Sequence, residues 1–107
     1  MNEAVRVDLV VPADHPAFAG HFPGAPVLPG VVLLAEAIEA LRARPELRPA
    51  SVTADAVLQV DHVKWLAPVG PGDRLVLALA ARDGSVDFDV TREATVMARG
   101  RLSWQPR

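Results

Sequence analysis

Hydrophobic and polar residues alternate with a period of two through most of the second half of the chain. In residues 86–91, three apolar side chains are interleaved with Asp87, Asp89 and Thr91, which is typical of a β-strand with one buried and one wet face. Turn sequences, Gly70-Pro71-Gly72-Asp73 and Asp83-Gly84, separate such segments. The pattern predicts strands at residues 57–66, 75–81, 86–91 and 95–104, and β-branched residues predict an earlier strand at 5–11.

Between the first strand and the other four, the period of the apolar residues changes to that of a helix. Pro29 suits the first turn of a helix, and the segment that runs from it to residue 43 ends before two further prolines, Pro45 and Pro49. Four apolar residues follow the spacing i, i+3, i+7, i+10 and are expected to form one buried stripe: Val31, Leu34, Ile38 and Leu41. Glu36 and Glu39 fall on another side of this helix.

The order of these elements predicts an α+β fold in which an antiparallel sheet of about five strands packs on a single long helix. We find no internal repeat and no linker, so residues 1–107 are expected to form a single domain. One helix covers only one face of such a sheet and leaves its edges unpaired. We therefore expect a homodimer.

Residues 12–29 form a segment that can be neither helix interior nor central strand, because it holds five of the ten prolines. No formally charged residue lies between Asp14 and Glu36, and apolar residues such as Phe18 and Phe22 would be costly to expose. The segment is expected to be an ordered, largely buried loop, and such loops often carry function.

Composition removes several classes of function. The 107 residues carry a formal charge of −2 and no basic stripe, which argues against binding to nucleic acid. There is no cysteine, and none of the three histidines, His15, His21 and His62, has a second histidine at a metal-ligand spacing, so we expect no metal. The sequence offers neither a signal peptide nor a membrane span, so a cytoplasmic protein is expected.

The loop before the helix contains the residues most suited to chemistry. His21 lies among apolar residues, which favour the neutral imidazole that can accept a proton. Gly30 opens the helix, where the first N–H groups have no partner within the helix, and a glycine lets a carbonyl oxygen approach closely. A base beside a hydrogen-bond donor can remove a proton next to a carbonyl. The simpler interpretation is that His21 is a structural histidine.

A resemblance favours the chemical interpretation. Gly20-His21-Phe22-Pro23-Gly24, Pro26-Val27 and Leu28-Pro29-Gly30-Val31 resemble the active-site segment of the FabZ/FabA-type 3-hydroxyacyl-acyl-carrier-protein dehydratases. The segment Val63-Lys64-Trp65-Leu66-Ala67-Pro68-Val69 and the turn Pro71-Gly72-Asp73 are also similar to these families. In its short length the chain resembles the ApeI-like dehydratases. The resemblance implies a hotdog fold, a homodimer and active sites between subunits.

By this resemblance His21 is the catalytic base and Gly30 the residue whose N–H binds the thioester carbonyl. The acidic residue of FabZ and FabA lies fourteen positions after the histidine, where this chain has Ala35. We expect the neighbouring Glu36 to replace it, with Glu39 as the alternative. Both glutamates could instead belong to a solvated helix face. Phe22 and Val31 are expected to line the substrate site.

The predicted function is therefore dehydration of a 3-hydroxyacyl thioester, carried on acyl carrier protein or coenzyme A, to the trans-2-enoyl thioester without a cofactor. Two alternatives remain open: a hotdog thioesterase that activates water with a carboxylate, and a non-catalytic acyl-binding subunit. An acidic carrier protein would dock on exposed arginines, for which the candidates are Arg42, Arg44, Arg99 and Arg101.

Overall fold

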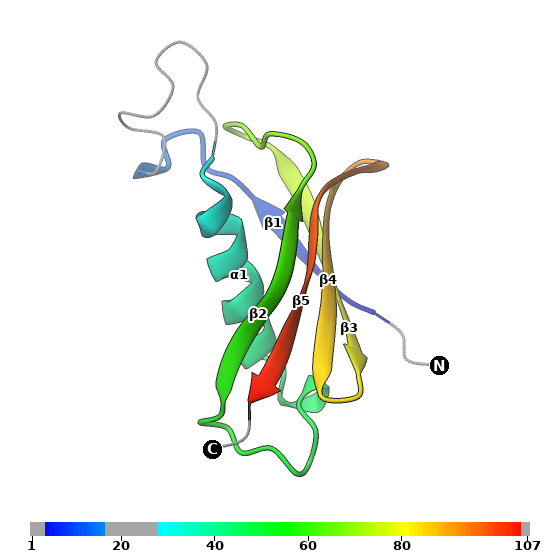
Figure 1. Cartoon of the computed structure of the whole chain (residues 1–107). Helices are drawn as coiled ribbons and strands as arrows, with labels where there is room; N and C mark the ends of the chain where they lie inside the picture. The colour runs from blue at the N-terminus through cyan, green and yellow to red at the C-terminus, as the bar shows by residue number, and fades with distance from the viewer. Residues whose placement is uncertain (1–3, 17–27, 106–107) are drawn as a thin grey trace.

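One helix packs against one five-stranded antiparallel sheet in the computed structural model, which describes residues 4–16 and 28–105 (Figure 1). The elements follow the predicted order: β1 (Val5–Val10), α1 (Gly30–Arg42), a short 3-10 helix η2 (Pro45–Leu47), β2 (Val57–Trp65), β3 (Arg74–Arg82), β4 (Ser85–Arg92) and β5 (Thr95–Gln105). Each predicted strand and the predicted helix are confirmed to within one residue at either end. Residues 17–27, which make up most of the loop expected to be ordered and buried, lie outside the described part.

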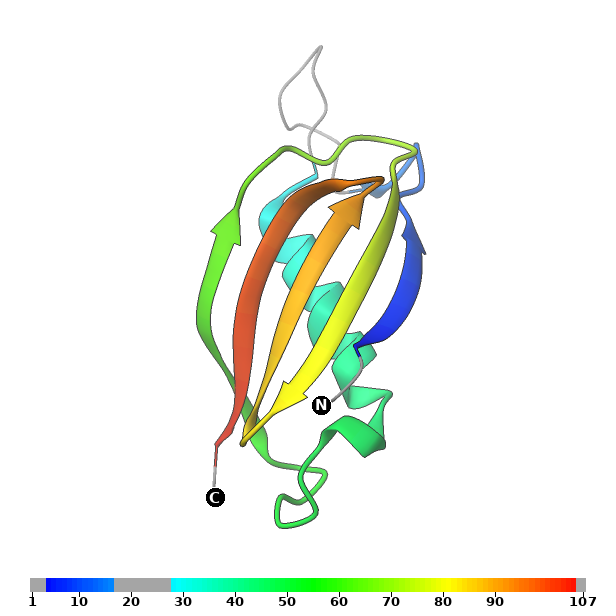
Figure 2. The ribbon, with the colours of Figure 1, turned by 90° about the vertical axis from the view of Figure 1, so that its right-hand side faces the viewer.

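The strands lie in the order β1-β3-β4-β5-β2, so β1 and β2 are the two edges of the sheet (Figure 2). Tight turns join the central strands. Arg82 pairs with Ser85 across the two-residue turn Asp83-Gly84, and Gly84 has a φ of 72°, a conformation in which glycine is favoured. Strand β2 follows the helix and η2 in sequence and returns to pair with β5 at the far side.

The core lies between the inner face of the sheet and one face of the helix. Alternate residues of the central strands are almost fully buried, as the period of two predicts: Leu75, Leu77, Leu79, Val86, Phe88, Val90, Leu102 and Trp104. From the helix, the buried residues are Leu33, Ala37 and Leu41. Burial of these apolar side chains is the main source of stability in a domain of this size.

The predicted helix stripe is wrong in its orientation. Of its four members only Leu41 is buried, Leu34 and Ile38 are half-buried, and Val31 is 67% exposed. The buried face of α1 is rotated about the helix axis relative to the predicted face. The rotation is a little less than the angle of about 100° between successive helix residues. Ala37, which has no exposed surface, explains the difference, because a small side chain lets the helix approach the sheet closely along that line.

Charged pairs cover the outer face of the sheet. The Arg101 Nε donates to Asp87 at 2.8 Å, the Arg82 guanidinium reaches the same carboxylate at 3.0 Å, and Arg99 lies 3.6 Å from Asp89. Burial alone would raise the pKa of Asp87, but the hydrogen bonds and charges of Arg101 and Arg82 outweigh it and hold that pKa below its ordinary value. This face is therefore wet and polar, as the alternation of residues 86–91 predicts.

The Pro-Gly-Asp turn between β2 and β3 is held by its aspartate. Asp73 accepts a hydrogen bond from the Gly70 N–H at 2.8 Å and another from the Arg92 guanidinium at 2.9 Å. The Val11 N–H donates to the Asp73 carbonyl, and the Gly72 N–H donates to the Val11 carbonyl. These bonds join the turn to the end of β1 and to the end of β4, so this part of the resembling sequence has a structural role.

In the centre of β5, Gly100 allows close packing at the β2 edge. A β-carbon at this position would collide with the backbone carbonyl of His62 in β2 and lie 2.8 Å from the Phe88 ring. The chain departs from regular pairing just here, with a register shift between Val60 and His62. The absence of a side chain at Gly100 therefore lets the Phe88 ring and the irregular part of β2 come together.

Gly100→Ala is expected to destabilise the protein by roughly 1–3 kcal/mol, the usual cost of overpacking a core. The backbone carbonyl of His62 can move away only if β2 shifts relative to β5. Thermal or urea unfolding measures the loss. The control is Thr95→Ala at the exposed beginning of the same strand, which should change stability by less than about 0.5 kcal/mol. Equal stability of Gly100→Ala and wild type would contradict this account of the strand pairing.

Candidate active site

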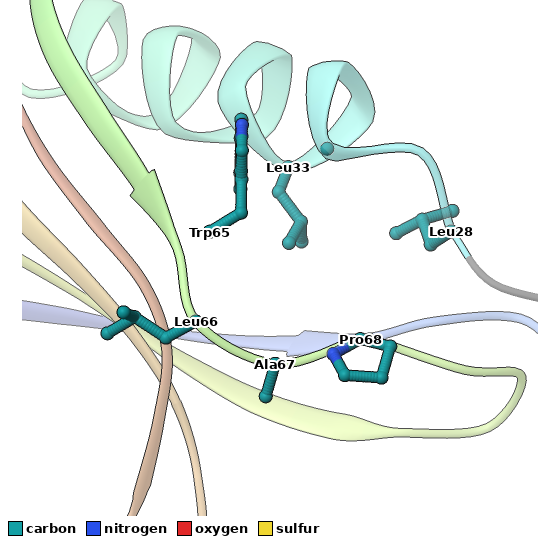
Figure 3. Close-up of a pocket in the computed structure, with 7 residues that line it drawn as sticks. Leu28, Leu33, Trp65, Leu66, Ala67 and Pro68 are labelled. Atoms are coloured by element: carbon teal, nitrogen blue, oxygen red, sulfur yellow. The ribbon is translucent and has the colours of Figure 1, made fainter.

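A pocket of about 350 Å³ lies at the beginning of α1, between the helix and the segment that follows β2 (Figure 3). It is lined by Leu28, Gly30, Leu33, Trp65, Leu66, Ala67 and Pro68. Trp65 rises from the end of β2 towards the helix, and Leu33 projects from the helix into the same space (Figure 3). None of these side chains is charged, so the pocket is suited to an uncharged, largely apolar group.

Backbone hydrogen bonds fix the two sides of this pocket. The Leu28 N–H donates to the Val69 carbonyl at 2.7 Å, which ties the residue before the helix to the segment after β2. On the other side, the N–H groups of Leu66 and Ala67 both donate to the Met97 carbonyl of β5, at 2.9 and 3.2 Å. These hydrogen bonds anchor the pocket walls, although the segment between β2 and β3 has no regular secondary structure.

Gly30 and Trp65 are in direct contact. A β-carbon on residue 30 would lie 2.8 Å from Cε2 and 2.9 Å from Cζ2 of the Trp65 indole, which is closer than real β-carbons approach other atoms. Glycine at this position therefore makes room for the indole ring. The ring packs on the first turn of α1 while Trp65 remains 50% exposed.

The first turn of α1 presents its positive end to the pocket without compensation from its own side chains. Pro29 is the N-cap residue and provides no side-chain hydrogen bond, and the first turn holds no acidic residue. The Val32 N–H is used by the Pro29 carbonyl at 3.0 Å. The partial positive charge of a helix N-terminus favours a ligand oxygen that carries negative charge. A developing enolate oxygen beside Gly30 would meet this requirement.

Two of the expected site residues, His21 and Phe22, lie outside the described residues. The sequence nevertheless limits what that segment can supply, because His21 is the sole titratable side chain among residues 17–27. Since no titratable side chain from the described ranges lines the Gly30 pocket either, a carboxylic acid at this pocket has to reach it from elsewhere on the chain or from a second chain.

Glu36 faces a different pocket from Gly30. This second cavity, of about 80 Å³, lies between β1 and α1 and is lined by Leu9, Val10, Val11, Pro12, His15, Leu28, Val32, Leu33, Glu36 and Leu75. Leu28 and Leu33 line both pockets and so form the partition between them. Glu36 is nevertheless exposed, as are Glu39 and Ala35, the last of which stands at the position of the family acid. Val31 is largely exposed and does not line the Gly30 pocket.

The other histidines and the candidate docking arginines are scattered. His15, expected at an exposed loop tip, is instead half-buried beside the second pocket, because the turn after β1 folds back towards the helix. His62 is exposed on β2. Arg42 is exposed at the last turn of α1 and Arg44 is half-buried just beyond it. Arg99 and Arg101 lie on the outer sheet face with carboxylate partners.

Of the seven residues that line the pocket, only Gly30 has a site role in the sequence-based prediction, and Trp65 and Leu33 are among the six that it missed. The segment around Trp65 contributes to the prediction only through its similarity to the dehydratase family. Leu33 falls outside the predicted apolar stripe of the helix. One feature of the sequence could have pointed to Trp65. It is a large indole near the end of a predicted strand, in a chain with only two tryptophans. Neither a group of metal-ligating side chains nor a membrane-spanning helix occurs within residues 4–16 and 28–105.

Comparisons with known proteins agree with this geometry. The model of the ApeI-like family, described as ApeI dehydratase, matches residues 1–101. The chain is 36% identical over 99 residues to the 3-hydroxyacyl-[acyl-carrier-protein] dehydratase FabZ of Herpetosiphon aurantiacus, an alignment that covers 86% of this chain and 70% of that protein. The chain therefore belongs to the ApeI-like dehydratase family.

Solved structures establish the fold. The dehydratase heterocomplex ApeI:P from Xenorhabdus doucetiae contains a chain similar to this one with a TM-score of 0.76 and 19% identity, covering 99% of this chain and 90% of that one. A putative thioesterase from Prochlorococcus marinus is similar with a TM-score of 0.62 and 18% identity, covering 94% and 78%. The arrangement is the hotdog fold, as the resemblance of the sequence implies, and it is shared by dehydratases and thioesterases.

Proposed function

We propose that this protein dehydrates a 3-hydroxyacyl thioester, carried on acyl carrier protein or coenzyme A, to the trans-2-enoyl thioester. The observation that carries the proposal is the uncharged pocket onto which the uncapped first turn of α1 opens at Gly30. Family membership and the His21-Phe22-Pro23-Gly24 sequence support it. We place this chemistry in the cytoplasm, together with its carrier-bound substrate.

In the proposed reaction, His21 takes a proton from C2 of the substrate, and the electron pair moves towards the thioester carbonyl. The N–H of Gly30 donates to that oxygen and stabilises its enolate character. A carboxylic acid protonates the hydroxyl on C3, the C3–O bond breaks, and water leaves as the C2–C3 double bond forms. The proton on His21 returns to the acid through solvent. Phe22 and Val31 are proposed to contact the acyl group.

A mass-spectrometric assay on a 3-hydroxyacyl-carrier thioester tests this proposal. We expect wild type to produce a thioester lighter by one water. His21→Ala should lower the rate by about 10²–10⁴-fold, the usual contribution of a general base, with the fold unchanged by circular dichroism. Release of the free acyl acid would indicate a thioesterase, and an unchanged substrate would indicate an acyl-binding subunit. A folded His21→Ala variant with the wild-type rate would refute the role of His21.

The thioesterase alternative has the support of structural relatives such as the Prochlorococcus protein, but that similarity concerns the fold alone. A hotdog thioesterase that activates water needs a carboxylate to do so. The described residues that line the Gly30 pocket offer none. Dehydration as proposed also needs a carboxylic acid, so this absence does not separate the two reactions. The His21-Phe22-Pro23-Gly24 sequence and the match to the ApeI-like dehydratase family favour dehydration.

The acid of the reaction is proposed to be Glu36, with Glu39 as the alternative one turn further along the exposed side of α1. Glu36 supports this assignment by its position beside Ala35 and by its place at an apolar pocket bounded by Leu28 and Leu33. That partition stands between Glu36 and Gly30 within one chain. Glu36 can act at the Gly30 pocket only if the partition opens or if the two residues come from different subunits.

Glu36→Gln and Glu39→Gln, measured side by side, decide between the two carboxylates. Each change removes the acidic proton while it preserves shape, so we expect Glu36→Gln to lower the dehydration rate by about 10²-fold or more and Glu39→Gln to leave it near wild type. The reverse result would transfer the role to Glu39. Wild-type rates in both variants would exclude a helix carboxylate and contradict the assignment.

We propose further that the chain forms a homodimer through β2. This edge strand and the residues beside it expose several large apolar side chains: Val57 at 50%, Val60 at 40%, Trp65 at 50% and Leu66 at 51%. Val31, at 67%, adds to them from the helix. The opposite edge, β1, exposes one large apolar residue, Val10, beside the charged Arg6 and Asp8, whereas β2 exposes more apolar residues beside its own charged Asp61 and Lys64. An unpaired apolar edge favours pairing with a second copy, whereas charges oppose it.

Light scattering at micromolar concentration should give twice the 11.4 kDa mass of the chain. Val60→Lys places a charge on the β2 edge and should yield monomers. Val10→Lys, the same change at an exposed valine of the β1 edge, is the control and should remain dimeric. A wild-type monomer, or a monomer that assembles only with a different hotdog chain, would contradict the homodimer.

An acidic carrier protein is the proposed partner of the dimer, and its docking residues are proposed among the four arginines. Arg99 and Arg101 already have carboxylate partners, whose attraction a carrier would have to replace. Arg42 and Arg44 lie at the opposite end of α1 from Gly30 in their own chain. The existing ion pairs of Arg99 and Arg101 favour Arg42 and Arg44 as the residues to examine first.

A further inference from the structure

The contact between Trp65 and Gly30 has a consequence for substrate choice. Cε2 and Cζ2 of the indole lie where a β-carbon of residue 30 would point, so the ring occupies the space directly beside the first turn of α1. Leu28 and Leu33 form the wall on the other side, and both are buried, with 5% of their surface exposed. The space between these walls is the pocket at Gly30, and its described lining is uncharged.

Selection in such a pocket depends on shape, because none of its described lining residues is charged. If the thioester carbonyl accepts a hydrogen bond from the Gly30 N–H, then C2, which is bonded to the carbonyl carbon, lies in the same pocket, and the Trp65 indole is one wall of that pocket. A hydrogen on C2 requires little space there. A methyl group on C2 that points towards this wall would need the space that the ring fills, and the ring cannot move towards the helix because it already contacts Gly30.

We propose that Trp65 is a specificity-determining residue that restricts the enzyme to 3-hydroxyacyl thioesters without a branch at C2. This inference rests on the proposed function, since it takes the Gly30 N–H as the partner of the thioester carbonyl. Trp65 itself moves no proton. Its effect is to exclude branched acyl groups from the position in which His21 and Gly30 would act on them.

The test compares two pantetheine thioesters, 3-hydroxybutyryl and 3-hydroxy-2-methylbutyryl, the latter as both C2 epimers. The kcat/KM ratio of unbranched to branched substrate is measured for wild type, Trp65→Phe and Trp65→Ala. The branched substrate is intrinsically less acid at C2, but this difference is the same for every variant and cancels when ratios are compared. One methyl group in a fitted pocket is worth roughly 10–200-fold in specificity.

We expect the ratio to fall by about 10-fold or more in Trp65→Ala, through a gain in kcat/KM for the branched substrate, and by less in Trp65→Phe, which keeps one ring. Trp104→Phe is the matched control. Trp104 is buried at the other end of β5 from Met97, and its indole nitrogen has no hydrogen-bond partner among the described residues, so the change should leave the ratio unaltered.

An unaltered ratio in both Trp65 variants would overturn the inference. So would folded variants that lose activity equally on both substrates, since Trp65 would then serve turnover in general. Wild type that dehydrates neither substrate would refute the proposed function instead. In that case a binding measurement still tests Trp65.

Trp104→Phe leaves Trp65 as the sole indole, since the chain has two tryptophans. Titration of this variant with the unreactive thioether analogue of butyryl-pantetheine should shift or quench its emission. Trp65→Phe, which keeps Trp104, should show no change. Unchanged emission at saturating analogue in the first variant would show that the acyl group does not lie beside Trp65, whatever the enzyme's activity.

Discussion

The burial of Leu33, Ala37 and Leu41 on the inner face of the sheet sets the rotation of α1, and the remaining features of the molecule follow from that rotation. It directs Gly30 towards the end of β2, where the Trp65 indole packs on it. It also leaves Glu36 on the side of β1 and Val31 on an open flank. Because apolar burial is the largest favourable term in folding, a different rotation of α1 would expose these side chains and cost the protein much of its stability.

Of the groups proposed to act in the pocket, the fold of a single chain fixes the hydrogen-bond donor but not the acid. The donor at Gly30 belongs to a helix anchored to the sheet by core packing and by the Leu28–Val69 hydrogen bond. The proposed acid, Glu36, has no such fixed place near the Gly30 N–H. Leu28 and Leu33 separate the pocket at Gly30 from the pocket at Glu36.

The sequence predicted the elements well because alternation and turn residues are local signals. The strand over residues 86–91 and the turn at Asp83-Gly84 needed no knowledge of distant residues. The predicted rotation of the helix was wrong because the actual rotation depends on which side chain comes closest to the sheet. A small residue such as Ala37 carries only a weak apolar signal in the sequence. The contact of Trp65 with Gly30 joins positions 35 residues apart, so no local pattern could reveal it. The roles of His21 and Gly30 come from a family sequence, and of the two only Gly30 lies within the described residues.

The two edges of the sheet differ in a way that limits assembly. Among the described residues, β2 exposes several large apolar side chains beside Asp61 and Lys64, whereas β1 exposes Val10 beside Arg6 and Asp8. When two chains join β2 to β2, each uses the same strand, and both outer edges of the combined sheet are then charged β1 strands. In the proposed homodimer both β2 strands are used by the single interface, so growth of the sheet stops by symmetry. A sheet with two apolar edges would instead add chains without limit and form fibres.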